Sequence, residues 1–235
     1  MATKNKWPAS TATLISPSST EARAAGASGP GWLARLLRRK TAIWILLVLP
    51  GLWPVWPLVL SRDPTVATDP GKYVLHHLGF TAAVLLALVL TFSPLRIFWP
   101  KSALVRALNR HRRLVGVSVF VYASLHLTMH FIYEGGFGTF ATDWKKPFIA
   151  FGLGAFAILL VLAVTSINPF VRRLGGRRWK NLHRLVYLAA GLVVWHQILA
   201  RKLFPPQVVW IFGPLILLEI ARIWHARARR PKKTA

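Results

Sequence analysis

Six apolar runs, separated by clusters of Lys and Arg, constrain the fold of this chain more than any other feature. The runs cover residues 41–60, 73–92, 114–133, 147–166, 182–200 and 208–224. A helix needs about 20 mostly apolar residues to cross the hydrocarbon core of a bilayer, because each residue advances it by about 1.5 Å. The sequence therefore predicts an all-α fold: a six-helix transmembrane bundle with both termini on the same side of the membrane.

The distribution of basic residues indicates which side that is. Of the 31 Lys and Arg residues, 25 lie in or beside the N-terminal segment, the second and fourth connections, and the C-terminal end. Four of the six acidic residues lie on the opposite side. Cytoplasmic segments of membrane proteins carry an excess of Lys and Arg. Both termini are therefore expected in the cytoplasm.

Charge and composition narrow the functional classes. A net charge of +25 would suggest nucleic-acid binding in a soluble protein. Here the charges lie between apolar runs, so we expect contact with membrane lipid and none with nucleic acid. The chain has no Cys, which excludes disulfides, thiolate metal sites and iron–sulfur clusters. We expect a disordered N-terminal tail over residues 1–30, a membrane domain over 31–226 and a basic cytoplasmic tail over 227–235.

Histidines are the main ionisable residues inside the predicted spans, where such residues are costly and often functional. His126 in the third span and His196 in the fifth lie at similar depth, in the outer half of the membrane. Imidazoles from facing helices are common axial ligands of a haem in a helical bundle. This pair therefore predicts one haem.

His183 precedes His196 by 13 residues and lies about 20 Å closer to the cytoplasm on an ideal helix. It could hold a second haem, which would make an electron path across the bilayer. The same spacing places the two side chains about 140° apart around the helix. A kinked or tilted helix, or haems offset sideways from each other, could absorb that angle.

The other candidates have simpler interpretations beside the functional ones. His111, expected in a solvated basic loop, lies at the right depth to be the inner haem partner of His183. His130 is an alternative ligand or, more simply, a hydrogen-bonding neighbour of His126. For His76, a functional role and an ordinary structural role are about equally supported. The remaining polar residues are expected to be interfacial or locally paired, namely His77, His225, and Glu219 with Arg222. Gly79, Gly116 and Gly191 permit close approach of either a porphyrin or another helix.

Several short stretches together resemble the MsrQ (YedZ) family, the haem-binding membrane subunits of bacterial methionine-sulfoxide reductase systems. They are DPGKYVLHHLG before and into the second span, TFSPLR at its exit, RRLVGV and SLHLT in the third span, the Thr-Ser pair ending the fourth, and RRWKNLHRLVYL leading into the fifth. The resemblance covers residues 41–225 and places the chain in the ferric reductase-like transmembrane superfamily. It also implies a location in the inner membrane of a bacterium.

The resemblance implies haem b on His126 and His196, with His183 also a ligand and His76 a further family position. It implies FMN in the electron path and a periplasmic molybdopterin-containing subunit that reduces methionine sulfoxide in oxidised envelope proteins. No Gly-rich dinucleotide fingerprint is present. We therefore expect an electron-transfer subunit, distinct from the catalytic one, that receives electrons from the quinone pool or a cytoplasmic flavin reductase.

Three other functions remain open at this stage. The first is a stand-alone ferric reductase or quinol-oxidising cytochrome b, which would hold haem without the molybdenum partner. The second is a transporter whose histidines form a proton or metal path, and that protein would be colourless. The third is a purely structural membrane subunit, in which every histidine could be replaced.

Overall fold

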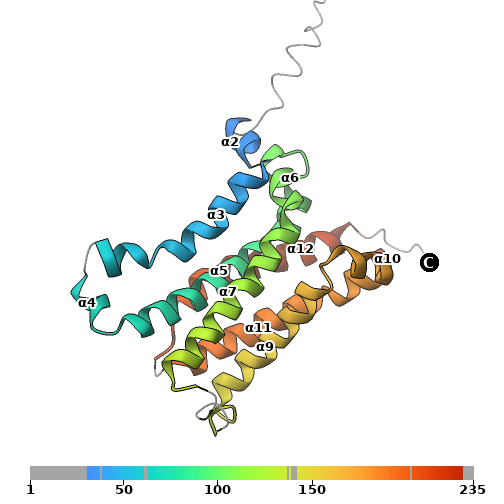
Figure 1. Cartoon of the computed structure of the whole chain (residues 1–235). Helices are drawn as coiled ribbons and strands as arrows, with labels where there is room; N and C mark the ends of the chain where they lie inside the picture. Colours follow the sequence, from blue (N-terminus) through green and yellow to red (C-terminus); the bar gives the residue numbers. More distant parts are fainter. Residues whose placement is uncertain are drawn as a thin grey trace, which may run out of the picture.

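The computed structural model describes residues 31–37, 39–60, 63–136, 138, 142–201 and 203–229. Within these ranges all regular structure is helical (Figure 1). The elements are α2 (Gly31–Leu36), α3 (Lys40–Leu52), the π-helical η1 (Trp56–Leu60), α4 (Pro64–Ala67), α5 (Pro70–Phe98), α6 (Ala103–Arg110), α7 (Arg112–Tyr133), α9 (Pro147–Val164), α10 (Asn168–Leu182), α11 (Leu185–Leu199) and α12 (Pro206–Ala228). The predicted N-terminal tail and the last six residues lie outside the described ranges.

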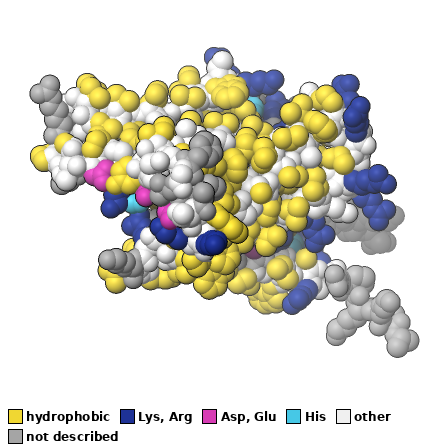
Figure 2. Space-filling view, turned by 60° about the horizontal axis from the view of Figure 1, so that its bottom comes forward, with side chains coloured by type: hydrophobic (Ala, Val, Ile, Leu, Met, Phe, Trp, Pro, Cys, Tyr) yellow, Lys and Arg dark blue, Asp and Glu magenta, His cyan; other side chains and the backbone are white. Residues whose placement is uncertain are grey.

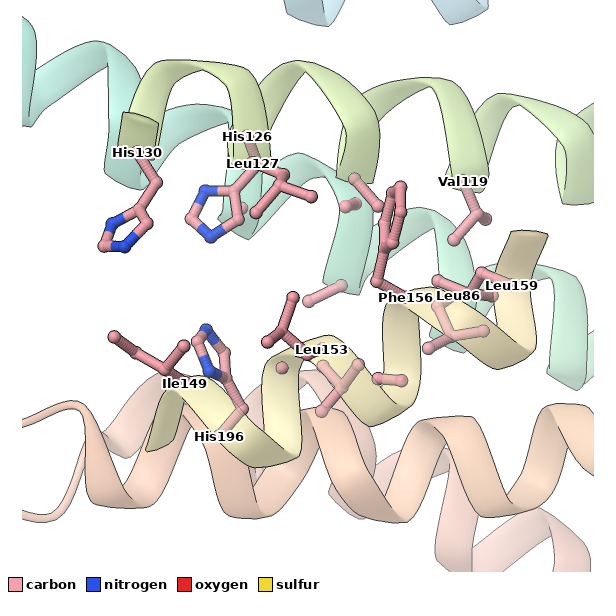
Figure 3. Close-up of a pocket in the computed structure, with 17 residues that line it drawn as sticks. Leu86, Val119, His126, Leu127, His130, Ile149, Leu153, Phe156, Leu159 and His196 are labelled. Atoms are coloured by element: carbon pink, nitrogen blue, oxygen red, sulfur yellow. The ribbon is translucent and has the colours of Figure 1, made fainter. Parts of the chain in front are cut away.

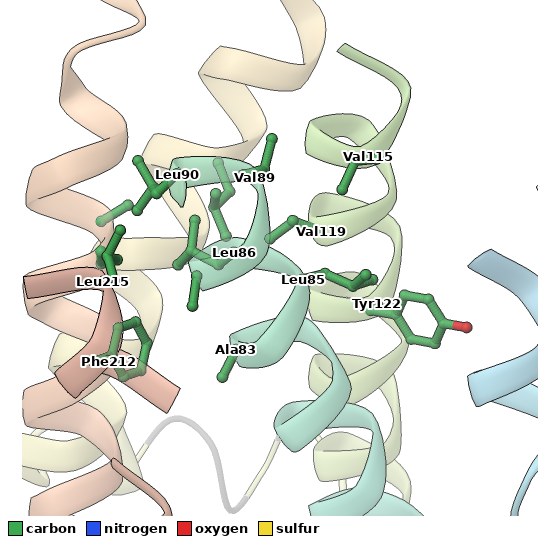
Figure 4. Packing of buried hydrophobic residues seen from close by; sticks show 14 of the residues in the cluster. Ala83, Leu85, Leu86, Val89, Leu90, Val115, Val119, Tyr122, Phe212 and Leu215 are labelled. Carbon is green, nitrogen blue, oxygen red and sulfur yellow. The ribbon is translucent and has the colours of Figure 1, made fainter. Parts of the chain in front are cut away.

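Helix α5 is the centre of the bundle. Its sequence is apolar on all sides, and such a helix is normally enclosed by others. Leu86 and Leu90 are 1% and 0% exposed. Figure 4 shows side chains of α5 packed between those of α7 on one side and those of α12 on the other. The central position of α5 explains why it has so many buried residues.

The long helices associate mainly in two pairs. Helix α5 lies along α7, and α9 lies along α11 (Figure 1). The pairs meet through contacts between α7 and α9 and between α5 and α11, and α12 packs on α5. This arrangement positions the site, because His126 is on one pair and His196 is on the other.

The first predicted span is not one continuous helix. α3 ends at Leu52, and η1 follows a turn that contains Pro54. Proline has no backbone N–H and cannot continue the hydrogen-bond ladder of a helix. The Pro50 carbonyl, which a continuing helix would bond to residue 54, is within 2.7 Å of His77 Nε2. Tyr122 also holds α3, donating to the Leu47 carbonyl at 2.6 Å.

Four described helices are long and apolar enough to cross a membrane: α5, α7, α9 and α12. Helices α10 and α11 together would make a fifth span, bent by 47°, and α3 is a shorter apolar helix. A multi-pass helical membrane protein is therefore supported, while six spans and cytoplasmic termini stay predictions. On the face in Figure 2, many Lys and Arg side chains gather at the right, while the acidic side chains lie toward the left with further basic side chains beside them.

The connection after α9 differs from the basic loop expected from sequence. Residues Asn168–Leu182 form α10, whose described side chains include none that is buried. The helix is interrupted at Gly175, where φ is 69°, a left-handed value that glycine adopts without strain. A second break separates α10 from α11 and contains His183. The chain thus changes direction just before the fifth apolar run.

Candidate functional site

His126 of α7 and His196 of α11 face each other across an apolar cavity of about 110 Å³, here called the outer cavity (Figure 3). Their ring centroids are 6.1 Å apart, and the ring planes are inclined at 81°. Small residues from three helices line much of the remaining wall: Gly79, Ala82, Ala83, Ala123, Gly152 and Ala155. The sequence predicted that His126 and His196 lie at equal depth, and the structure brings them together.

The hydrogen bonds of the two rings define their tautomers. His126 Nδ1 lies 2.9 Å from the Leu75 carbonyl oxygen, and His196 Nδ1 lies 2.7 Å from that of Phe148. A carbonyl oxygen can only accept, so each Nδ1 carries the proton and donates. In a neutral imidazole this leaves the lone pair on Nε2. Metal-binding histidines are commonly oriented in this way by a backbone carbonyl.

The pair fits a single metal held between two imidazoles. Metal–nitrogen bonds of about 2 Å on each side would separate the ring centroids by about 6 Å. The observed 6.1 Å agrees with that separation. Because the wall is apolar and includes several Gly and Ala residues, the donor set and surroundings suit a flat hydrophobic cofactor such as haem.

His130 also lines the outer cavity, one turn beyond His126 on α7 (Figure 3). Its ring contacts that of Phe131, with the centroids 6.4 Å apart. The two sequence interpretations, alternative ligand or hydrogen-bonding neighbour, both stay predictions. The structure establishes that the residue belongs to the cavity wall.

A second cavity, here called the inner cavity, has a volume of about 460 Å³ and includes His183 in its wall. It shares Leu86, Val119 and Leu159 with the outer cavity. These three apolar side chains form a septum between the two cavities. The two sites therefore lie end to end within the same bundle.

His183 is held by its neighbours in the inner cavity. Its ring stacks on Trp179 with a centroid distance of 3.9 Å, and its Nδ1 lies 3.1 Å from the Trp179 carbonyl oxygen. Ser166 Oγ is 3.3 Å from Nε2. Trp179 in turn donates from Nε1 to the Thr165 carbonyl at 3.1 Å. The break between α10 and α11 accounts for the angle between His183 and His196, since the two residues are not on one straight helix.

The rim of the inner cavity is strongly basic, whereas the described lining includes no Asp or Glu. Arg112 donates to Ser93 Oγ and Arg113 to Asn168 Oδ1, each at 2.8 Å. The five basic lining residues are Arg110, Arg112, Arg113, Lys180 and Arg184. An apolar cavity with such a rim suits a ligand that has a hydrophobic body and anionic groups.

Two further candidates are not brought to these cavities. His76 is exposed near the N-terminal end of α5 and does not line the outer cavity. His111 lies between α6 and α7 but is not among the residues that line the inner cavity. It is only 6% exposed, and its Nε2 atom has no hydrogen-bond partner. The expectation that His111 belongs to a solvated loop is therefore wrong, since its side chain is buried.

The other polar residues have local roles. Glu219 forms the expected ion pair with Arg222 at 2.7 Å, and it also accepts a hydrogen bond from Tyr187 at 3.2 Å. His225 contacts the ring of Phe98. His77, expected to be interfacial, instead makes the contact with α3 described above.

Sequence reasoning missed Gly152 and the carbonyl of Phe148. Both lie on α9, more than 40 residues before His196, which they contact. These contacts with His196 become visible only once α9 and α11 are known to lie side by side. Of the three glycines singled out from sequence, Gly79 lies against the His126 ring, whereas a Cβ at Gly116 or Gly191 would have nothing within 4 Å.

Comparison with known proteins gives consistent matches. The family model described as ferric reductase like transmembrane component matches residues 78–194. A heme-binding subunit MsrQ of protein-methionine-sulfoxide reductase from Brucella anthropi is 34% identical over 195 residues, covering 80% of this chain and 86% of the relative. The protein of the same description from Ralstonia nicotianae is 36% identical over 198 residues, covering 81% and 88%.

Proposed function

This chain belongs to the MsrQ family of haem-binding membrane subunits, and on that premise we propose that it carries electrons through haem to a protein-methionine-sulfoxide reductase. It is then an electron-transfer subunit, and the reduction of methionine sulfoxide takes place on its partner. The observation that carries the proposal is the His126–His196 pair, with both Nδ1 atoms donating to carbonyls and both rings facing one apolar cavity.

The outer cavity is proposed to hold haem b through His126 and His196. His126 and His196 would both hold the iron, and a haem held by two imidazoles would serve electron transfer rather than oxygen binding. The bound haem would supply the reversible one-electron chemistry. The chain itself fixes both tautomers through the Leu75 and Phe148 carbonyls, and the apolar wall excludes water from the site.

The inner cavity is proposed to hold a second haem with His183 as a ligand. Its basic rim would accommodate the carboxylates of the porphyrin, and its apolar wall the ring. The three-residue septum would keep the two cofactors close together. His111 and His76 stay candidates as further cofactor-binding residues, His111 by depth and His76 by the family resemblance.

The remaining parts of the proposal come from the family resemblance. Electrons would enter on the cytoplasmic side of a bacterial inner membrane, from quinol or a flavin reductase, and leave toward a periplasmic molybdopterin-containing subunit. FMN belongs to this path through the resemblance. Of the two cavities described above, the inner one has the basic rim that a phosphate group requires.

A transporter of protons or metal ions is less well supported. The septum of Leu86, Val119 and Leu159 interrupts the line between the outer and inner histidines with apolar side chains. A proton or metal path needs polar groups or water at that point. A stand-alone ferric reductase or cytochrome b would share the haem sites and differ in its electron acceptor.

The proposal is tested by the visible spectrum of the protein purified in detergent, oxidised and then reduced with dithionite, together with a pyridine haemochrome assay. We expect a Soret band that sharpens and moves to longer wavelength on reduction. The outer contribution should be lost in His126→Ala and in His196→Ala. A wild-type protein without haem, produced with ample haem supply, would contradict the proposal and favour the transporter.

A further inference from the structure

The two facing histidines are held by the same local arrangement on different helices. His126 donates to the carbonyl of Leu75, and its ring lies against Gly79 of α5. His196 donates to the carbonyl of Phe148, and its ring lies against Gly152 of α9. In both cases the glycine follows the accepting residue by four positions, so the arrangement is repeated once on each helix pair.

The four-residue spacing has a physical reason. In an α-helix the carbonyl of residue i already accepts the N–H of residue i+4, and a second donor must approach from the side. A side chain at i+4 would cover that approach, because helical side chains point back over the preceding turn. Glycine at i+4 leaves the carbonyl open to the imidazole.

The distances show how little room there is. A Cβ at Gly79 would lie 2.9 Å from both Cε1 and Nδ1 of His126. A Cβ at Gly152 would lie 2.8 Å from Nδ1 of His196. Either methyl group would push its ring away and disturb the hydrogen bond that sets the tautomer.

Two glycines on α9 and α11 lack such a close contact. Gly154 is two residues from Gly152 on α9, and a Cβ there would meet Leu192 Cδ1 at 3.5 Å, an ordinary contact. A Cβ at Gly191 on α11 would have nothing within 4 Å. Neither residue lines either cavity. The chain therefore offers matched control positions for the same Gly→Ala change.

We propose that Gly79 and Gly152 are positioning residues that seat the two imidazoles and hold their planes nearly perpendicular, at 81°. This inference rests on the proposed function, because it concerns the axial ligands of the outer haem. Crossed imidazole planes leave two of the iron d orbitals nearly equal in energy. A ferric haem in this setting gives a strongly anisotropic low-spin EPR signal, whereas parallel planes give a rhombic one.

The first experiment compares Gly79→Ala and Gly152→Ala with Gly154→Ala and Gly191→Ala, using purified haem-loaded protein and low-temperature EPR. We expect the strongly anisotropic signal in the wild type and in both controls. In Gly79→Ala and Gly152→Ala it should shift toward a rhombic or high-spin signal. A Gly152→Ala spectrum identical to that of Gly154→Ala would overturn the proposal.

A second experiment covers variants that fail to accumulate, and it does not need haem. If the Gly152 methyl group clashes specifically with the His196 ring, Gly152→Ala/His196→Ala should regain the yield and thermal stability of His196→Ala alone. Gly79→Ala/His126→Ala should likewise match His126→Ala. Double variants that remain as damaged as the glycine variants would overturn the seating role. Absence of haem from the wild type would instead contradict the proposed function. The recovery of yield and thermal stability in the double variants could still be measured in that case.

Discussion

The outer and inner cavities share a septum but differ in size, in charge and in the number of histidines that line them. The outer cavity is small and almost wholly apolar, and two histidines from separate helix pairs close on it with their Nδ1 atoms already satisfied. The inner cavity is larger, has His183 in its wall and carries five basic residues at its rim. The difference teaches that one bundle can enclose a small apolar cavity closed by two histidines beside a larger cavity lined by several positive charges.

The largest expected effect separates the two cavities by cofactor content. His183→Ala should remove the inner haem and leave the outer one, halving the haem per chain if the protein holds two. His126→Ala should do the reverse. Pyridine haemochrome assays with redox titration would assign the remaining haem in each variant.

The spectra of His183→Ala and His111→Ala test which residues hold the inner haem. Unchanged haem content in His183→Ala would show that the inner cavity holds no haem on this residue. His111→Ala sharpens the result further. A spectral change confined to the inner haem would identify His111 as its second ligand, and an unchanged spectrum would remove it from the site.

The next largest effect concerns the septum. Leu86 is 1% exposed and lines both cavities. Leu86→Ala should lower the free energy of unfolding by about 2–5 kcal/mol, because it leaves a void in a packed core. Leu88→Ala, on the same helix but 42% exposed, should change it by less than about 0.5 kcal/mol. Denaturant titration in detergent compares the two, and equal effects would mean that the septum is not tightly packed.

A smaller effect should distinguish the cavities electrostatically. A positive charge near a haem favours the reduced form, so removing one lowers the reduction potential. Arg113→Gln should lower the potential of the inner haem by about 40 mV, equivalent to about 1 kcal/mol for one electron, and leave the outer potential nearly unchanged. Arg96→Gln, outside both cavities, is the control in the same spectroelectrochemical titration. Equal shifts in both haems would contradict a charge effect local to the inner cavity.

The smallest effect belongs to the end of the α5–α7 pair where α5 begins and α7 ends. The Tyr133 hydroxyl, 2.6 Å away, and then the Lys72 backbone N–H lower the pKa of Asp69. A lowered folded-state pKa means that the stabilisation is present above the unfolded-state pKa and is lost as the pH falls through the folded-state value. Thermal unfolding between neutral and acidic pH should therefore show a decline that Asp69→Asn lacks. Tyr133→Phe should weaken the same decline, and an unchanged profile would exclude the contact as its source.

The sequence predicted much of the fold because membrane helices have a simple requirement. The apolar runs containing α5, α7, α9 and α12 are long enough to be recognised without knowing how they pack. The first run does not form one continuous helix, because Pro54 and Pro57 lack the backbone N–H groups that a helix needs, and the length of an apolar run does not register that lack. Helix α10 was taken for a loop, because a basic helix at the end of a span has no apolar run of its own.

The candidate site could be predicted only where one residue type carries the signal. His126 and His196 were found through their shared depth, which depends on position along each helix. Gly152, Leu75 and Phe148 contribute backbone groups or an absent side chain, and their role depends on which helices are neighbours. The burial of His111 could not be inferred for the same reason, since its surroundings come from packing among elements.

The division of the bundle into two helix pairs has a consequence for assembly. A cofactor bound by His126 and His196 would join the α5–α7 pair to the α9–α11 pair, much as a cross-link joins distant parts of a chain. Because cofactor binding is coupled to folding, part of the binding energy would appear as resistance of the two halves to separation. Haem supply would then govern the lifetime of the protein in the membrane as well as its ability to carry electrons.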